Sequence, residues 1–223
     1  MKKYLILLAV TGLFAMQASC QSTTERNKEV AAKAQENMLP IEVEMKDGLA
    51  RAYFASGCFW CVEAVYESVK GVDESISGYS GGTVQSPSYR SHGDHAEAVE
   101  IFYDPEVVTF ATLVDVYFGS QNITQVNGQG PDRGASYRSI IFYQNEEQKA
   151  IIDAKIAVIN KKLGGDKVAA QVMPFQKFWV GEAYHQDYER NNPGNPYVQN
   201  VSVPRLLRFQ KKFPDILKET AQH

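Results

Sequence analysis

Apolar and polar residues follow two periodicities along this chain, one typical of strands and one of helices. Residues 49–55 form a short run rich in Tyr and Phe, which indicates a buried strand, and a Ser-Gly break follows it. Beyond the break the apolar residues fall at helical spacing: Val62, Val65, Tyr66 and Val69. Gly71 supplies a stop for that helix. The pattern therefore predicts a strand that turns into a helix at Gly57 and Cys58.

The same two periodicities continue through the rest of the chain. Further strands are predicted at residues 73–79, 95–103, 136–143 and 168–172. Further helices are predicted after the caps Thr109 and Asn145, and over residues 183–190 and 205–213. Residues 119–135 are predicted as loop. This order predicts an α/β (α+β) protein with a two-layer split βαβ, ferredoxin-like core and an irregular C-terminal extension.

The segment 95–103 alternates strictly, and the alternation places two acidic residues on opposite faces. Glu97 lies on the apolar face, where a carboxyl group tends to be protonated and can donate a proton. Glu100, on the other face, is expected to be solvated. The alternative for Glu97 is an ion pair with an arginine such as Arg133 or Arg138.

Cys58 lies where the predicted strand becomes a helix, among the first free N–H groups of that helix. The partial positive charge there favours a thiolate over a thiol, so we predict a nucleophilic sulfur. A buried structural cysteine is the alternative. Phe59 and Trp60 follow the sulfur directly, and two such rings can form a slot for an apolar group such as a methyl.

The beginning of the chain has a different pattern. Two lysines precede an apolar run at residues 4–16, which indicates a signal peptide because the run is too short to span a membrane. Cys20 follows small residues, so residues 1–20 are predicted to be a lipoprotein-type signal peptide in which Cys20 is lipidated; plain secretion is the alternative. Residues 21–46 are predicted to be a polar tether and residues 47–223 one globular domain.

Composition and cysteine content exclude some classes of partner and some roles for the cysteines. The 223 residues carry a net charge of −3 and no basic block, which argues against a nucleic-acid partner. Of the three cysteines, only Cys58 and Cys61 remain as thiols if Cys20 carries lipid. Their spacing is too short for a useful structural disulfide, so outside the cytosol the pair is expected to be redox-active or metal-bound.

Six motifs then occur in order along the globular part: Gly57-Cys-Phe-Trp60, Gly78-Tyr-Ser-Gly-Gly82, Pro87-Ser-Tyr89, His95-Ala-Glu-Ala-Val99, Tyr103-Asp-Pro105 and Gly130-Pro-Asp-Arg-Gly-Ala-Ser-Tyr-Arg-Ser139. Each motif alone is weak, but the ordered set closely resembles the peptide methionine sulfoxide reductases of the A type. The resemblance extends from about residue 52 to residue 190, nearly the whole predicted domain.

This resemblance implies that residues 47–223 are a catalytic domain in which Cys58 is the nucleophile and Glu97 the proton donor. It also implies two sulfoxide-binding tyrosines, a supporting acid and two methyl-binding aromatic residues: Tyr89, Tyr137, Asp132, Phe59 and Trp60. On local context alone the tyrosines could be ordinary packing residues and Asp132 a turn residue. Preference for the S epimer of the sulfoxide is likewise implied only by the resemblance.

Many relatives of this kind keep their recycling thiols in the C-terminal tail, and this chain has no cysteine there. We therefore expect Cys61 to condense with the sulfenic acid of Cys58 and form a Cys58–Cys61 disulfide, which a thioredoxin-like donor then reduces. The alternative is that the donor attacks the sulfenic acid directly and Cys61 only packs.

Other interpretations use the same cysteines. A thioredoxin-like thiol–disulfide oxidoreductase also places Cys-x-x-Cys at a helix start, but it carries a βαβ unit ahead of the motif, and here one strand precedes it. A zinc-binding Cys2His2 site would join Cys58 and Cys61 to His92 and His95, across an unusually long gap. A lipid-anchored binding module without chemistry would leave Cys58 inert.

The expectation is therefore a monomeric enzyme of the bacterial cell envelope, exported and attached to the membrane through Cys20. It reduces methionine S-sulfoxide, free or in oxidised proteins, and a thioredoxin-like dithiol restores it. The proposed chemistry uses thiols alone and requires no metal, nucleotide or flavin cofactor.

Overall fold

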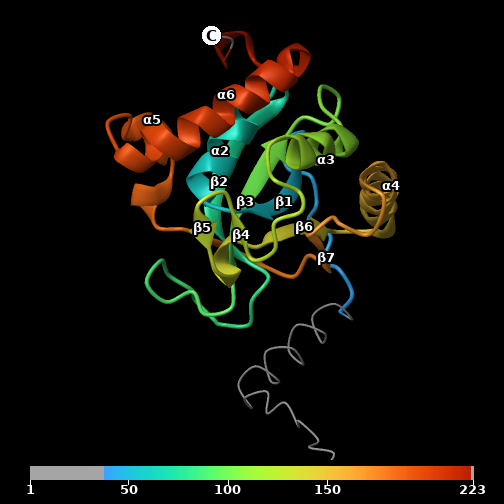
Figure 1. Cartoon of the computed structure of the whole chain (residues 1–223). Helices are drawn as coiled ribbons and strands as arrows, with labels where there is room; N and C mark the ends of the chain where they lie inside the picture. Colours follow the sequence, from blue (N-terminus) through green and yellow to red (C-terminus); the bar gives the residue numbers. More distant parts are fainter. Residues whose placement is uncertain (1–37, 222–223) are drawn as a thin grey trace, which may run out of the picture.

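The computed structural model describes residues 38–221 and contains one mixed six-stranded sheet, with strand order β7-β6-β1-β3-β2-β8 (Figure 1). The four central strands pair antiparallel with one another: β1 (Ala50–Ser56), β2 (Val72–Ser80), β3 (Ala96–Tyr103) and β6 (Ser139–Tyr143). Two helices connect them: α2 (Phe59–Glu67) after β1 and α3 (Phe110–Gly119) after β3. This is the split βαβ order, so the predicted fold class is confirmed.

Two short strands extend the core at its edges. After the long helix α4 (Glu146–Leu163), β7 (Gln171–Pro174) pairs in parallel with β6, three residues later than the predicted strand begins. On the other edge β8 (Phe178–Val180) pairs with β2 and was not predicted. A two-residue hairpin, β4 (Gly128–Gln129) with β5 (Asp132–Arg133), lies inside the predicted loop. Such short strands carry no periodic pattern that would predict them.

The C-terminal extension is built from short helical pieces, most of which Figure 1 shows above α2. In chain order these are η2 (Ala183–His185), α5 (Tyr188–Asn191), the π-turn η3 (Val198–Ser202), α6 (Val203–Lys212), η4 (Pro214–Ile216) and η5 (Glu219–Ala221). The single helix expected at residues 183–190 is interrupted, because Asp187 has a left-handed φ of 52°. The backbone N–H of Asp187 donates instead to the buried carboxylate of Glu63.

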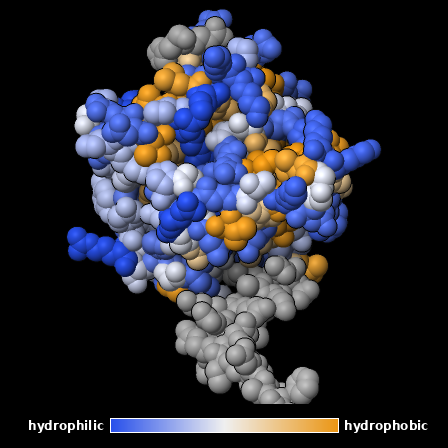
Figure 2. Space-filling view, viewed as in Figure 1, coloured by the Kyte–Doolittle hydropathy of each residue, from blue (hydrophilic) through white to orange (hydrophobic). Residues whose placement is uncertain are grey.

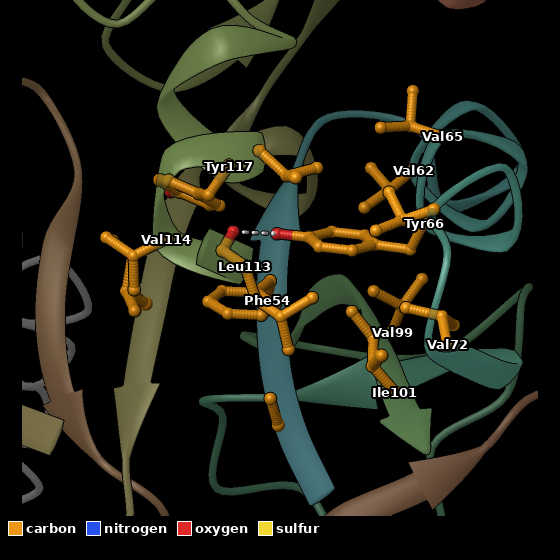
Figure 3. Packing of buried hydrophobic residues seen from close by; sticks show 14 of the residues in the cluster. Phe54, Val62, Val65, Tyr66, Val72, Val99, Ile101, Leu113, Val114 and Tyr117 are labelled. Carbon is orange, nitrogen blue, oxygen red and sulfur yellow. Dashed lines mark hydrogen bonds between the residues drawn. The ribbon is translucent and has the colours of Figure 1, made fainter. Parts of the chain in front are cut away.

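The main core lies between the sheet and its helices. Phe54 of β1 stacks on Tyr66 of α2 with ring centroids 5.2 Å apart, and the Tyr66 hydroxyl donates to the carbonyl of Leu113 at 3.2 Å (Figure 3). Val99 and Ile101 of β3 belong to this core, as the predicted alternation requires. Glu97 is therefore on the helix-covered face of the sheet.

The opposite face of the sheet is also covered, which changes the environment of Glu100. Phe175 stacks on Tyr53 at 3.7 Å, and the segment before β1 joins it through the Ile41 N–H to the Phe175 carbonyl at 2.8 Å. Glu100 is only 8% exposed and accepts a 2.8 Å hydrogen bond from the Tyr53 hydroxyl. The expectation that Glu100 is solvated is wrong, because distant segments cover this face.

The beginning of the chain is only partly described. Ile41 and Val43, at the end of the predicted tether, already hydrogen-bond to the domain, Val43 through its N–H to the Gln144 side chain at 3.0 Å. The predicted signal peptide, Cys20 and the first part of the tether lie outside the described residues. Within residues 38–221 no helix is long and apolar enough to cross a membrane. Figure 2 shows hydrophobic patches interspersed with hydrophilic residues on one face.

The turn between β1 and α2 depends on Gly57. Its φ is +87°, in the left-handed region that favours glycine, and a Cβ atom there would lie 2.5 Å from the Cβ of Gln129. Gln129 belongs to β4, and its side chain joins this hairpin to Gln121 and Asn122. The glycine therefore lets the hairpin approach the residue that precedes Cys58.

We predict that Gly57→Ala lowers the free energy of unfolding by about 3 kcal/mol, since it combines left-handed backbone strain with displacement of a buried side chain. Gly164→Ala is the matched control, because Gly164 has φ +72° and a Cβ atom at this position would meet nothing within 4 Å. It should lose only the strain contribution, about 1 kcal/mol. Denaturant unfolding measures both; equal losses would show that the contact with Gln129 does not matter.

Candidate active site

Cys58 occupies the capping position of α2, directly after the β1 strand and the Gly57 turn. The residue is 6% exposed. Burial, reinforced by the neighbouring Cys61 and by the carboxyl of Glu97, raises the pKa of the Cys58 thiol well above its ordinary value. The prediction of a resting thiolate is not supported, because burial opposes the field of the helix N-terminus and favours the protonated thiol.

Glu97 on β3 meets the start of the same helix. Its carboxyl accepts a 3.1 Å hydrogen bond from the backbone N–H of Phe59, and the residue is 2% exposed. Burial raises the pKa of Glu97 to about 8, against the opposing effect of the Phe59 hydrogen bond, and the charge of Asp132 adds to the increase. At neutral pH Glu97 is thus mostly protonated, as its place on the apolar face predicts.

The ion-pair alternative for Glu97 is not supported. No lysine, arginine or histidine of the described chain forms a salt bridge with it. Arg138 instead donates to the carbonyls of Ala135 at 2.9 Å and Gly81 at 2.8 Å. Glu97 is left as a neutral acid facing the cysteine.

A pocket of about 300 Å³ brings the predicted residues together from five parts of the chain. Its lining is Cys58, Phe59, Trp60, Tyr89, Glu97, Asp132, Tyr137, Asn195 and Tyr197. Seven of these are the residues predicted for substrate contact, nucleophile and acid. Cys61, the remaining predicted catalytic residue, lines the neighbouring cavity instead.

The two predicted tyrosines enter this pocket as hydrogen-bond donors. Tyr89 is 38% exposed and lies in the loop after β2, where its backbone N–H donates to Glu182 at 2.9 Å. Tyr137 ends the short turn η1 (Ala135–Tyr137). Burial raises the pKa of both phenols, so both keep their protons. Neither hydroxyl is bonded to another described residue, which leaves both donors available to an oxygen in the pocket.

Phe59 and Trp60 form the aromatic wall, and the C-terminal extension holds the indole in place. Trp60 stacks on Tyr188 with centroids 3.7 Å apart and planes 8° apart. Its indole N–H donates to Nδ1 of His185 at 3.1 Å, and His185 also contacts the ring of Phe59 at 4.9 Å. A rigid apolar surface therefore lies directly beside the sulfur, suited to a methyl group.

Asp132 has a partner that sequence analysis did not identify. The Tyr197 hydroxyl donates to the Asp132 carboxylate at 2.6 Å and lies 3.7 Å from the sulfur of Cys61. Tyr197, Asn195 and His185 were all overlooked, since they lie in a Pro- and Asn-rich tail without periodicity and twelve tyrosines made any single one uninformative. The only available signal was the density of aromatic residues in that tail.

Cys61 lies on α2, one turn beyond Cys58, and is 2% exposed. Both cysteines are free thiols in this structure. The adjoining Cys58 thiol and the positive charge of Arg205 lower the pKa of Cys61, although burial opposes them. The guanidinium of Arg205 therefore favours the ionised form of Cys61.

The four residues of the zinc interpretation do not converge. Nε2 of His92 is 2.8 Å from the Ser136 hydroxyl, whereas His95 lies between the Gly82 N–H and the Val84 carbonyl. Among the described residues, the group that could hold a metal is Glu63, Glu67 and Asp187, and it contains neither cysteine. Arg190 already pairs with Glu67 and Asp187. The geometry thus contradicts a Cys2His2 site.

Comparison with known proteins agrees with the geometry. Residues 50–217 match the family described as peptide methionine sulfoxide reductase. The MsrA enzyme of Pasteurella multocida is 41% identical over 172 residues, which cover 75% of this chain and 98% of that protein. The one of Sulfolobus acidocaldarius is 42% identical over 168 residues, covering 74% and 95% respectively.

Solved structures show the same fold. Reduced Mxr1 from Saccharomyces cerevisiae matches with a TM-score of 0.60 and 30% identity, over 69% of this chain and 91% of that one. Methionine sulfoxide reductase A of Corynebacterium diphtheriae matches with a TM-score of 0.60 and 26% identity, over 71% and 84%. The matched span contains the cysteine pair, Glu97 and every other residue of the pocket. The chain belongs to the peptide methionine sulfoxide reductase family.

Proposed function

We propose that this chain reduces the S epimer of methionine sulfoxide, free or in oxidised proteins, with Cys58 as the nucleophile. The observation that carries the proposal is the pocket itself. A buried thiol and a protonated carboxyl face one small space that has an aromatic wall and two phenol donors. A methyl sulfoxide has the matching parts: an apolar methyl, an oxygen that accepts hydrogen bonds, and an electrophilic sulfur.

In the proposed reaction the sulfur of Cys58 attacks the sulfoxide sulfur while Glu97 protonates the departing oxygen. Tyr89 and Tyr137 donate to that oxygen, and Phe59 and Trp60 hold the methyl group. An S–S bond forms between Cys58 and the methionine sulfur as the S–O bond breaks and the oxygen leaves as water, with the thiol proton and the one that Glu97 gives. Water then attacks the Cys58 sulfur, the S–S bond breaks, and the released proton returns to Glu97. Cys58 is left as a sulfenic acid and methionine leaves as the thioether. The sulfoxide gains the two electrons that Cys58 loses.

In the second step Cys61 condenses with the sulfenic acid, which releases water and forms the Cys58–Cys61 disulfide. Two features support this role: the two cysteines lie one helical turn apart, and the tail contains no other thiol. A thioredoxin-like dithiol is the proposed reductant of the disulfide.

The proposed location is the bacterial cell envelope, with the domain exported and attached to the membrane through lipidated Cys20. The support comes from the sequence of residues 1–20. A monomer is proposed because the sulfur, the acid and both phenols all come from one chain.

The test of the function is turnover of each methionine sulfoxide epimer with dithiothreitol as reductant. We expect release of methionine from the S epimer and little from the R epimer, because one handedness places the methyl against Phe59 and Trp60 while the oxygen meets Glu97. Absence of activity on both epimers would refute the proposal, and turnover of the R epimer alone would refute the orientation.

Glu97→Gln should preserve the fold and slow methionine release by about 10²–10⁴-fold, because the departing oxygen loses its proton source. Stopped single turnovers with the S epimer measure the rate, and circular dichroism checks the fold. Glu74→Gln is the matched control, since Glu74 is an exposed carboxylate on the neighbouring strand β2. A Glu97 variant within a few-fold of wild type would contradict the role.

The pH dependence follows from the same group. Only protonated Glu97 can donate, and its pKa is about 8, so the ratio of wild-type to Glu97→Gln rates should fall as pH rises through about 8. Because the carboxyl of Glu97 also raises the pKa of Cys58, the thiol of each protein is titrated separately and the rates are compared after correction for its ionisation. A ratio that stays constant between pH 6 and pH 10 would show that the carboxyl does not donate.

Cys61→Ser separates the two routes of recycling. If Cys61 resolves the sulfenic acid, the variant should still release about one methionine per enzyme in a single turnover, while thioredoxin-driven turnover collapses. A sulfenic acid trappable by dimedone should then accumulate on Cys58. Unchanged thioredoxin-driven turnover would instead mean that the donor attacks the sulfenic acid directly.

Cys20→Ala tests the anchor. The variant should leave the membrane fraction and keep its activity, because the segment between Cys20 and the domain is long and polar. Fractionation of cells with an activity assay on each fraction measures this. Persistent membrane association would point to an uncleaved signal segment or a second anchor.

A further inference from the structure

A second and larger cavity lies next to the substrate pocket and has no role in the reaction described so far. Its volume is about 720 Å³, within the range of small-molecule sites. Asp132 and Tyr197 line both spaces and so form the wall between them. The two cysteines adjoin but line different spaces: Cys58 lines the substrate pocket and Cys61 lines the larger cavity.

The two spaces differ in charge. The substrate pocket contains the carboxylate of Asp132 and the protonated carboxyl of Glu97, and no cation lines it. The larger cavity shares Asp132 but adds Arg205, Arg208 and Lys212, so its positive groups outnumber its single acid. An anion is therefore favoured in the larger cavity and disfavoured beside Cys58.

The three cations differ in how many contacts they make with the protein. Arg205 is buried and donates to Ser56 and to the carbonyl of Ser120 at 2.9 Å, so its guanidinium is committed to the fold. Arg208 is exposed on α6 and makes no hydrogen bond or ion pair with any residue from 38 to 221. Lys212 makes only a 3.4 Å contact with the Gly119 carbonyl and lies over the ring of Phe213. Arg208 and Lys212 can thus bind a ligand.

The remaining wall is polar. Gln121, Asn122 and Gln129 are joined by side-chain hydrogen bonds of 2.8–3.2 Å, and Gln125 closes the hairpin through bonds to Gly130. This amide surface is held in place before any ligand arrives. A small molecule with amide or carboxylate groups fits such a wall better than an apolar one does.

We propose that this cavity binds an anionic thiol of low molecular weight, which opens the Cys58–Cys61 disulfide by attacking Cys61. The proposal rests on the disulfide of the proposed function and adds a second route for its reduction. For a protein dithiol to reach the disulfide, the structure around Cys58 and Cys61 must open, because the two residues are only 6% and 2% exposed. Cys61 lines the cavity, so a small thiol bound there lies next to this residue.

The exchange balances in two steps. The first thiolate bonds to the sulfur of Cys61, the S–S bond breaks, and Cys58 leaves as a thiol because Glu97 protonates its sulfur during departure; water then returns a proton to Glu97. A second thiolate then attacks the ligand sulfur of the mixed disulfide. Cys61 leaves as a thiolate, and the two small thiols depart as their own disulfide. The small thiols supply both electrons, and both cysteines are again reduced.

The test compares three thiols on the disulfide form of the full domain: 3-mercaptopropionate, 2-mercaptoethanol and cysteamine, which are anionic, neutral and cationic. Arg208→Gln should lower the second-order rate constant for 3-mercaptopropionate about threefold in low salt, the size expected for one exposed charge a few ångströms from a carboxylate. The constant for 2-mercaptoethanol should not change, and that for cysteamine should rise. About 1 M salt should abolish the differences.

Lys211→Gln is the matched control, since Lys211 is an exposed cation on the same helix but does not line the cavity. It should leave all three constants nearly unchanged. Acid-quenched intermediates, fragmented in a mass spectrometer, should carry the 3-mercaptopropionate adduct on Cys61. An adduct on Cys58, or equal effects of the two variants, would overturn the proposal.

The outcomes also distinguish failure of the cavity proposal from failure of the proposed function on which it rests. A chain that reduces methionine sulfoxide with dithiothreitol but discriminates none of the three thiols by charge would overturn only the cavity proposal. The cavity proposal alone would also be overturned if a protein dithiol reduced the disulfide readily and no small thiol reduced it measurably. Failure to form the Cys58–Cys61 disulfide after reaction with sulfoxide would refute both.

Discussion

The hydrogen bond from the Phe59 N–H to the Glu97 carboxyl is the contact on which the site depends. The first N–H groups of a helix have no partner within the helix, and here one of them is satisfied by a side chain of the strand β3. Because β1 pairs antiparallel with β3, with Phe54 opposite Val99, the turn after β1 delivers Cys58 alongside Glu97. One contact thus satisfies the helix end, orients the acid and sets its distance from the sulfur.

Burial has opposite consequences for the two reacting groups. It raises the pKa of Glu97 to about 8, which produces a proton donor, and it raises the pKa of Cys58, which withholds the thiolate. The reaction tolerates this, because its first step begins with a neutral thiol and a neutral sulfoxide and ends with a neutral sulfenic acid and a thioether. A dry pocket disfavours separated charges, and the overall step requires none.

The sequence predicted the features of the structure that depend on local periodicity, such as which face of a strand a residue occupies. Strict alternation placed Glu97 on the helix-covered face because a strand has a side-chain period of two. The same alternation failed for Glu100, whose cover comes from Phe175 and Ile41, remote in sequence. Burial also explains the error over the Cys58 thiolate, because the sequence shows the helix start but not what packs over it. The β4–β5 hairpin has too few residues to establish any period.

The motifs of the core do not predict the whole site, because residues of the C-terminal extension position part of it. The ferredoxin-like core supplies the sulfur and the acid, but the tail fixes Trp60 through His185 and Tyr188, and it anchors Asp132 through Tyr197. The tail follows an irregular path, and its left-handed turn at Asp187 is tied to α2 by Glu63, whose pKa burial raises to about 7. Helix α2 therefore carries the nucleophile at its first turn and the attachment point of the tail on its next. The chemistry and the wall that encloses it are set by the same nine-residue helix.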